Sequence, residues 1–371
     1  MYCPKCGMEN LDNAHVCRSC GGQLSPPPVP SAGVVPKTSG LAIAAFVLGI
    51  LSLFTCGLTA IPAIVLGIIS FILIERSGGR LAGTNFALLS IFGPVILLLF
   101  GGIFAPALLK MRQTDRRMKC STNLMGIGKA MLIYGNDYDG QFPRSAGKSG
   151  QWAMAIPNWR GNNRYVAYGL APDGSGGRGT ISSCFYLLVR YGKVMPKSFI
   201  CPGDSGSREF KPAKYAYENA ELIDLWDFGP EPQKHCSYSY HQPFSQYPLT
   251  TSSAWGMAVA ADRSPWMASP ASDGKATKFA RFHPEGNRKS IKIGNAIQHD
   301  ENGQNVLFTD NHVNFEKNAF CGVNDDNVFT FWDGPDIRKG GLPLSGASEP
   351  RDKLDSLLLH DGYASVPGGG R

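Results

Sequence analysis

The sequence predicts a multi-domain membrane protein: a small cysteine-rich module, transmembrane helices, and an α+β domain in which a long N-terminal helix packs on an antiparallel sheet. Three observations predict this class. Cysteines cluster in the first twenty residues, and the long apolar runs fall between residues 41 and 109. An amphipathic segment then leads into residues 141–350, which are rich in glycine, proline and aromatic side chains and show no helix-length periodicity.

The overall composition limits the classes of function. With 371 residues the chain is long enough for two or more structural units. Its net charge of +7 is modest, and its basic residues do not form one large cluster. The charge balance therefore does not favour a nucleic-acid partner.

The first expected element, residues 1–24, carries two C-x-x-C pairs, in CPKC and CRSC. Each such turn points two sulfurs at one centre, and two turns complete a tetrahedral thiolate site for structural Zn²⁺. A segment this short cannot bury a core, so the metal would supply its folding energy. The predicted ligands are Cys3, Cys6, Cys17 and Cys20. Redox dithiols are the alternative, but such motifs normally accompany a βαβ pattern, which is absent here.

This segment resembles the short zinc ribbons found at the start of many bacterial membrane proteins. Because a four-cysteine site needs reduced thiols, we expect residues 1–24 to lie in the cytoplasm. Residues 25–40 follow as a proline-rich, semi-rigid linker.

The predicted transmembrane region spans residues 41–109. Its first apolar run, 41–74, carries no charge and is longer than one bilayer crossing needs. Gly57 and Pro62 interrupt this run, which favours a helical hairpin over one long tilted helix. Residues 81–109 are predicted as a further membrane helix. Through SGLAIAAFVLGILSLFTCGLTAIPAIVLGIISF and RSGGRLAGTNFALLSI, the region resembles the small membrane domain known as DUF4190.

The hairpin would place the N-terminus and the loop that holds Arg76 and Arg80 on the cytoplasmic side, as the positive-inside rule favours. The next helix would then carry the chain outward. We therefore expect a multi-pass protein of the cytoplasmic (inner) membrane with an extracytoplasmic C-terminal domain. A single first crossing is the alternative. It would return that domain to the cytoplasm, which the cluster of cations at residues 110–119 favours.

Residues 110–140 are predicted as the soluble half of a long helix that leaves the membrane. From residue 124 the apolar positions recur at helical spacing, and GNDYDG supplies turn chemistry at the end. This helix is expected to open a β-rich head, residues 141–345. A flexible tail, residues 346–371, is expected to complete the chain.

The segment PALLKMRQTDRRMKCSTNLMGIGKAMLIYGNDYDGQFP resembles the opening helix of type IV pilins and type II secretion pseudopilins, of the kind abundant in Planctomycetes. LLVRYGKVMPKSFICPGD and NAIQHDENGQNVLFTDNHVNF resemble two later stretches of that family, the second being its signature of His, nine residues and Asp-Gly. Here ten residues separate His299 from Asp310, and Asn311 stands in place of the glycine. The resemblance implies a pilin-like head.

The stretch NVLFTDNHVNF also predicts a β-hairpin on its own pattern. Asp310 and Asn311 lie at its turn, and both residue types tolerate the left-handed backbone that a two-residue turn requires. The alternative use of these residues is a cation-binding loop formed by Asp300, Asp310 and Asn311.

Five cysteines lie beyond the apolar region. If the domain is extracytoplasmic, four of the five would form two disulfides, and the sequence does not choose the partners. Buried free thiols are the alternative. The candidates are Cys120, Cys184, Cys201, Cys236 and Cys321.

The histidines of the C-terminal region fit no recognisable nucleophile, phosphate or metal motif, so we expect no enzyme activity and no small-molecule substrate. The resemblance implies a membrane-anchored, pseudopilin-like structural protein of the cell envelope, linked to a type II secretion or pilus-like assembly. Its partners would be the lipid bilayer and other envelope or pilin-like proteins. The alternative is a membrane-tethered zinc-ribbon regulator of a cytoplasmic protein or nucleic acid, although Lys5 and Arg18 are a weak footprint for nucleic acid.

Overall fold

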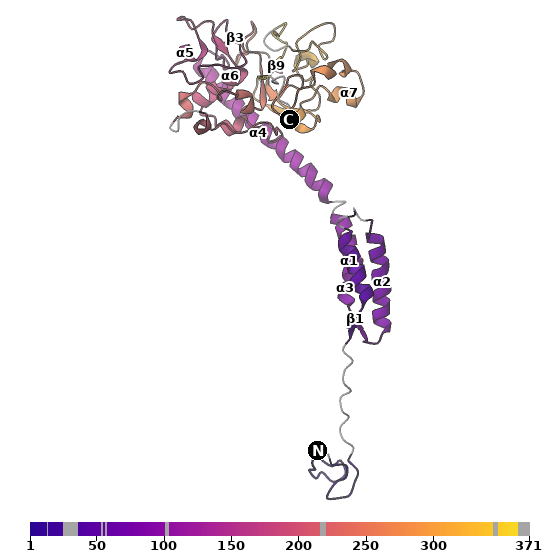
Figure 1. Cartoon of the computed structure of the whole chain (residues 1–371). Helices are drawn as coiled ribbons and strands as arrows, with labels where there is room; N and C mark the ends of the chain where they lie inside the picture. Colours follow the sequence, from indigo (N-terminus) through magenta and orange to yellow (C-terminus); the bar gives the residue numbers. More distant parts are fainter. Residues whose placement is uncertain are drawn as a thin grey trace, which may run out of the picture. The chain divides into compact units, whose positions relative to one another are not determined.

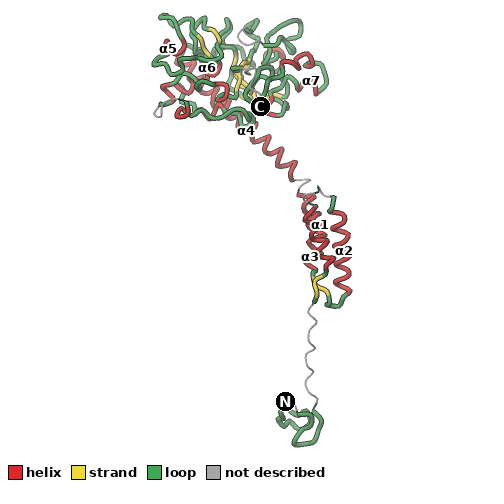
Figure 2. The backbone as a smooth tube through the Cα atoms, in the orientation of Figure 1, coloured by secondary structure: helices red, strands yellow, loops and turns green. Residues whose placement is uncertain are grey.

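The chain divides into two compact units, Met1–Leu109 and Lys110–Arg371, in the computed structural model. Figure 1 labels several elements of each unit, and Figure 2 separates helices from strands and loops. The structure describes residues 1–12, 14–24, 36–52, 55, 58–100, 104–215, 220–343 and 348–362. Most of the predicted linker, the interruption around Gly57 and the last nine residues lie outside this part of the chain.

Three short helices of the first unit pack against one another, and a two-stranded parallel sheet joins their ends. The contacts between the helices use small side chains: Ala42, Ala45, Ala63 and Ala87 are fully buried. The elements are β1 (Lys37–Thr38), α1 (Gly40–Leu51), α2 (Ala60–Arg76), β2 (Leu81–Ala82) and α3 (Thr84–Leu99).

The predicted transmembrane region 41–109 is not supported. Among the described residues, no helix combines the length and the apolar character needed to cross a membrane. The longest apolar helix, α2, has 17 residues, or about 25 Å at about 1.5 Å per residue, against a hydrocarbon core of about 30 Å. The run 41–74 is divided between α1 and α2, and the run 81–109 contributes α3, which has 16 residues and contains Pro94.

The same finding overturns the multi-pass location in the inner membrane. The predicted cytoplasmic and extracytoplasmic sides of the chain depended on those crossings, and the prediction of the lipid bilayer as a partner depended on them too.

A long helix, α4 (Ala105–Asp137), leads into the second unit. The predicted continuous helix from the apolar region into this unit would pass through residues 101–103, which lie outside the described residues. One stripe of α4 is buried from Cys120 onward, at the alternating spacing of three and four residues that defines one helix face. The buried stripe consists of Cys120, Leu124, Ile127, Met131 and Tyr134.

A five-stranded antiparallel sheet lies in the middle of the second unit, in the order β8-β7-β6-β5-β9. Leu307 lies on the face of the sheet that packs against α4. Its neighbours Val306 and Phe308 belong to a second apolar cluster on the opposite face. Both faces of the central strands are therefore buried. The strands are β5 (Tyr238–His241), β6 (Ala258–Asp262), β7 (Gln304–Phe308), β8 (Val313–Glu316) and β9 (Leu358–Leu359).

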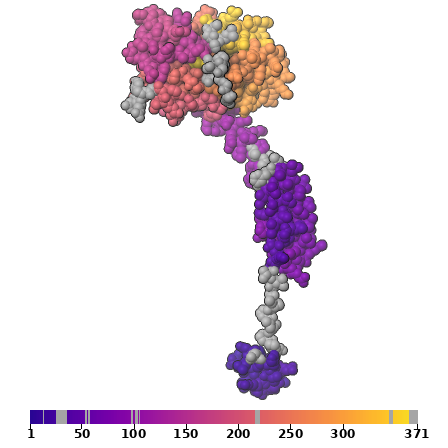
Figure 3. Space-filling view, viewed as in Figure 1, coloured from indigo at the N-terminus to yellow at the C-terminus, as the bar shows by residue number. Residues whose placement is uncertain are grey.

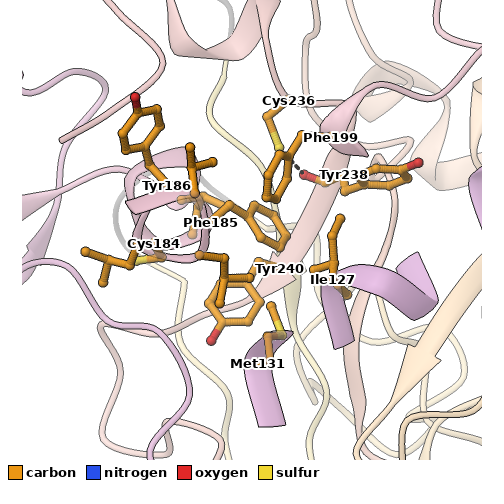
Figure 4. Close-up of a cluster of buried hydrophobic side chains, with 14 of the residues drawn as sticks. Ile127, Met131, Cys184, Phe185, Tyr186, Phe199, Cys236, Tyr238 and Tyr240 are labelled. Carbon is orange, nitrogen blue, oxygen red and sulfur yellow. Dashed lines mark hydrogen bonds between the residues drawn. The ribbon is translucent and has the colours of Figure 1, made fainter. Parts of the chain in front are cut away.

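The larger core joins α4 to the sheet and to α6 (Ile181–Arg190). Figure 4 shows Ile127 and Met131 of α4 beside Phe185 of α6 and Tyr240 of β5. The Phe185 ring centroid lies 5.1 Å from that of Tyr240. Figure 3 shows residues of this unit, coloured magenta to yellow, as one closely packed body. A long helix on an antiparallel sheet is thus present.

The remaining elements of the second unit are short. They are β3 (Gln151–Trp152), α5 (Arg164–Tyr168), β4 (Arg178–Gly179), η2 (Pro196–Phe199), η3 (Pro212–Lys214), η4 (Leu222–Asp224), η5 (Pro232–Lys234), η6 (Ala276–Arg281), α7 (Arg288–Lys292), η7 (Ile297–His299) and η8 (Val323–Asp325). Irregular loops that connect these pieces form most of the region predicted as a β-rich head.

The predicted flexible tail 346–371 is wrong over its described part, residues 348–362. Leu357, Leu358 and Leu359 are fully buried, and β9 pairs with the edge of β5. The three consecutive leucines place apolar side chains on both faces of the sheet, because successive residues of a strand point to opposite sides.

Candidate metal centre

The N-terminal residues fold into two similar turns, each opened by a cysteine. In the first turn the N–H of Gly7 donates to the carbonyl of Cys3 at 2.9 Å. In the second, the N–H of Gly21 donates to the carbonyl of Cys17 at 3.0 Å. Gly7 and Gly21 have φ values of +71° and +69°, the left-handed region in which glycine carries no steric cost. The sequence CxxCG thus forms each turn by local backbone chemistry.

The two turns bring four sulfurs together. Cys3 Sγ lies 3.7 Å from Cys20 Sγ, and Cys6 Sγ lies 3.6 Å from Cys17 Sγ. All four sulfurs lie within 4.8 Å of one another. A tetrahedral zinc site with Zn–S bonds of about 2.3 Å separates its sulfurs by about 3.8 Å. The donor set and its spacing therefore fit Zn²⁺.

Asn10 connects the two turns behind the sulfurs. Its Nδ2 donates to Cys17 Sγ at 3.5 Å and to the carbonyl of Met8 at 2.8 Å. Its Oδ1 accepts from the N–H of Arg18 at 3.0 Å. Such outer contacts orient the ligands of a metal site. The backbone N–H groups of Cys20 and Ser19 lower the pKa of the Cys17 thiol to about 6, which favours the thiolate that binds metal.

The comparison with known families agrees with this geometry. Residues 2–24 match the family model of the zinc-ribbon domain. Residues 2–24 form a zinc ribbon. Structural zinc binding by the four predicted cysteines is thereby confirmed. The match covers the ribbon alone, and the chain matches no curated protein and no solved structure. The pilin-type and DUF4190 resemblances are without support from these comparisons.

The predicted cation loop is not assembled in the second unit. Asp300 precedes β7, and Asp310 and Asn311 follow it, so the strand separates them. Asp300 Oδ2 accepts from Gln113 Nε2 at 3.0 Å, and Asp310 pairs with His312. The turn between β7 and β8 is longer than the two residues expected, because residues 309–312 separate the strands. Asn311 has φ +69°, whereas Asp310 is not among the residues with positive φ. The turn explains these residues without a cation.

The five candidate disulfide cysteines have different partners. Cys120 of α4 is bonded to Cys201, which follows η2 and lies 81 residues later. The other three are free thiols, so the described residues hold one of the two expected disulfides. Cys184 contacts Ser145 at 3.4 Å, and Cys236 and Cys321 donate to nearby backbone carbonyls.

A second group of metal-ligating side chains was missed by the sequence reasoning. It consists of Cys120, Cys201, Asp262 and His299, all buried. These residues come from four elements and share no spacing motif. One signal was available: Asp262 ends the apolar strand GMAVAAD, where a carboxylate must lie close to the core.

Proposed function

We propose that this is a non-enzymatic interaction protein whose zinc ribbon docks a partner protein. The observation that carries the proposal is the apolar surface of the ribbon. Tyr2, Met8, Leu11 and Val16 are 68%, 52%, 69% and 52% exposed. The ribbon's own cluster is Cys3, Cys17 and Leu24, with Met1 and Ala14 packed against it, so these four side chains add nothing to it. Four large exposed apolar side chains on a module of this size favour a protein contact.

A nucleic-acid partner is the competing use of the ribbon. Lys5 and Arg18 are its only lysine and arginine residues, and Tyr2 is its only aromatic one. Binding to nucleic acid draws most of its affinity from several phosphate contacts and from stacked aromatic rings. The composition of the ribbon supports a protein partner instead.

The absence of enzyme activity is part of this proposal. Three of the buried histidines of the second unit, His235, His241 and His360, contact backbone carbonyls. His235 Nδ1 lies 2.8 Å from the carbonyl of Arg208, and His241 Nε2 lies 3.1 Å from that of Tyr247. Burial lowers the pKa of His241 to about 4, so it stays neutral at neutral pH. These contacts support structural roles.

A pilin-like contact through α4 is the second candidate function. Within the second unit, α4 packs on the core from Cys120 onward, whereas the preceding residues 110–119 are mostly exposed. Met111 and Met118 are 67% and 64% exposed. A helix that is packed along one half and open along the other supports assembly with pilin-like proteins through the open half.

The ribbon proposal is tested by recovering the full chain with its partners from its host cells. We expect the triple variant Tyr2→Ser, Leu11→Ser, Val16→Ser to lose its specific partner at least tenfold, a loss of about 1.4 kcal/mol. Trp255→Ser is the matched control, because Trp255 is 87% exposed but lies in the second unit. Zinc content shows that the variant ribbon is folded. Equal recovery by the triple variant contradicts the proposal, and a partner removed by nuclease supports the competing one.

The pilin-like contact is tested by a photo-crosslinking amino acid at residue 118 of the full chain. We expect crosslinks to other proteins or to a second copy. The same group at residue 133 is the control, because Ile133 is 63% exposed on the packed half of the same helix. Equal crosslinking from both positions contradicts this second function.

A further inference from the structure

The group Cys120, Cys201, Asp262 and His299 has the composition of a metal site. One ligand atom from each lies within 4.8 Å of the others. His299 Nε2 lies 3.7 Å from Cys201 Sγ and 3.1 Å from Asp262 Oδ2. We propose that these four side chains bind one Zn²⁺ when the Cys120–Cys201 disulfide is reduced. The second unit then holds a redox-gated zinc site that is independent of the ribbon.

The spacing of these atoms is close to that of a tetrahedral site. Zinc bonds of about 2.3 Å to sulfur and about 2.1 Å to nitrogen and oxygen place neighbouring ligand atoms about 3.4 to 3.8 Å apart. The distances from His299 Nε2 to its two neighbours differ from this range by a few tenths of an ångström at most. Opening the disulfide frees the two sulfurs, and small side-chain rotations then complete the tetrahedron.

The carboxylate of Asp262 is only partly satisfied within the described residues. Asp262 is fully buried, and its Oδ1 has no hydrogen-bond partner among the described residues. The neighbouring cation, Arg263, is paired with Asp204 at 3.0 Å. A buried, unpaired carboxylate oxygen is costly, and a divalent cation would compensate it.

The surroundings hold the ligands as outer contacts do in metal sites. The backbone N–H and the Nδ2 of Asn305 donate to Asp262 Oδ2 at 2.7 and 3.1 Å. The N–H of Gly203 donates to Cys201 Sγ at 3.4 Å. A Cβ on Gly203 would lie 2.2 Å from the carbonyl oxygen of Gln298, so glycine lets the loop after Cys201 pack against the segment that carries His299.

The site is covered on one side and approachable on another. The ring of Phe315 lies edge-on to His299, with centroids 5.8 Å apart, and the guanidinium of Arg117 lies 4.2 Å from the Phe315 centroid. A cavity of about 190 Å³ lies next to the site, since Gly203 and Gln298 line it. An ion could enter through this cavity.

The redox step requires a dithiol reductant. The reductant gives two electrons and two protons to the Cys120–Cys201 bond and becomes a disulfide itself, while the two cysteines become thiols. Zinc then displaces both thiol protons and forms two Zn–S bonds. Oxidation by a disulfide reverses the sequence and releases the ion.

The experiment measures zinc per full chain in two redox states. The chain is reduced with a dithiol, freed of reductant without oxygen, loaded with Zn²⁺ and separated from free metal. We expect about one zinc per oxidised chain, held by the ribbon, and about two per reduced chain. The Cys6→Ser variant lacks a ribbon ligand. We expect it to hold about no zinc when oxidised and about one zinc per chain when reduced. Cobalt in the reduced Cys6→Ser chain should show sulfur-to-metal charge transfer and tetrahedral ligand-field bands.

The control variants replace one proposed ligand, or a cysteine outside the site, in the full chain. His299→Ala and Asp262→Asn should hold about one zinc in both redox states, and Cys321→Ser should behave as the wild type. Circular dichroism records folding in every sample. The proposal is overturned if reduced Cys6→Ser keeps its second unit folded but binds no zinc. It is equally overturned if zinc fails to keep the reduced second unit of this variant folded. It is also overturned if its cobalt spectrum lacks sulfur ligation.

Discussion

Asp361 caps α6, because its carboxylate Oδ1 accepts from the backbone N–H of Ile181 at 2.8 Å across 180 residues of chain. Its Oδ2 accepts from the N–H of Ser182 at 2.7 Å, and the indole of Trp152 donates to Oδ1 at 3.0 Å. The first N–H groups of a helix have no partner inside the helix, and a carboxylate there also suits the helix dipole. The C-terminal strand β9 is thereby tied to α6.

Replacing this cap should destabilise the second unit. We expect Asp361→Ala to lower the free energy of unfolding by about 2–3 kcal/mol, because buried N–H groups lose a charged acceptor. Asp361→Asn is the matched control and should lose less, since its amide oxygen still accepts. Urea unfolding followed by tryptophan fluorescence measures both. A change below about 0.5 kcal/mol in Asp361→Ala would show that the cap does not contribute.

Two glycines of α4 give opposite predictions for the same substitution. A Cβ on Gly128 would lie 2.2 Å from Asn311 Oδ1 and 2.7 Å from Leu307 Cδ1, whereas a Cβ on Gly126 would meet nothing within 4 Å. We expect Gly128→Ala to destabilise the unit by about 1–3 kcal/mol through overpacking. Gly126→Ala should stabilise it by about 1 kcal/mol through helix propensity.

Thermal and urea unfolding of the two variants, side by side, check this contrast. Because both changes have the same effect on the unfolded chain, the difference between them isolates the contact of α4 with the β7–β8 hairpin. Similar stabilities for the two variants would mean that α4 does not approach Leu307 as closely as the structure shows.

A buried carboxyl group should make stability depend on pH. Burial, and then the nearby Asp361, raises the pKa of Asp227 from 3.8 to about 8. The unfolded group loses its proton near pH 4, while the folded group keeps it until about pH 8. The folded chain therefore binds more protons between these values, and the free energy of unfolding falls as pH rises, by up to about 1.4 kcal/mol per pH unit.

Asp227→Asn should remove this contribution, since an amide does not titrate. We expect the stability of the variant relative to the wild type to increase between pH 4 and pH 8. Urea unfolding at several pH values measures the difference in free energy of unfolding between the variant and the wild type. The opposite effect of His241 cancels in this difference, because both proteins contain it. That histidine, with its pKa lowered by burial to about 4, adds stability as pH rises from about 4 to about 6.5. A difference that stays constant with pH would contradict the prediction.

The sequence predicted best where the structure depends on local chemistry. The four zinc ligands follow from two C-x-x-C turns closed by Gly7 and Gly21. The β7–β8 hairpin follows from two short apolar segments that flank the turn residues Asp310 and Asn311. The buried stripe of α4 from Leu124 onward follows from the helical spacing of its apolar residues. Each signal lies within a few neighbouring residues.

The sequence predicted poorly where distant segments meet. The apolar runs between residues 41 and 109 predict bilayer crossings, yet helices α1 to α3 use small residues to pack on one another. The burial of residues 348–362 depends on β5 and α6, which lie more than a hundred residues earlier. The pairing of Cys120 with Cys201, and their approach to His299, likewise depend on tertiary packing rather than on spacing.

Asn10 should strengthen zinc binding without being a ligand. Its Nδ2 contacts Cys17 Sγ, and its Oδ1 holds the N–H of Arg18. We expect Asn10→Ala to weaken zinc affinity by about 10- to 100-fold, because the second turn loses the group that orients its thiolate. Competition with a chromophoric chelator measures the zinc affinity. The chain is kept oxidised, so that the proposed second site is closed by its disulfide and the measured zinc is that of the ribbon. Glu9→Ala is the control, since Glu9 is exposed and adjacent, and it should leave the affinity unchanged. Equal affinities for both variants would assign Asn10 to the backbone turn alone.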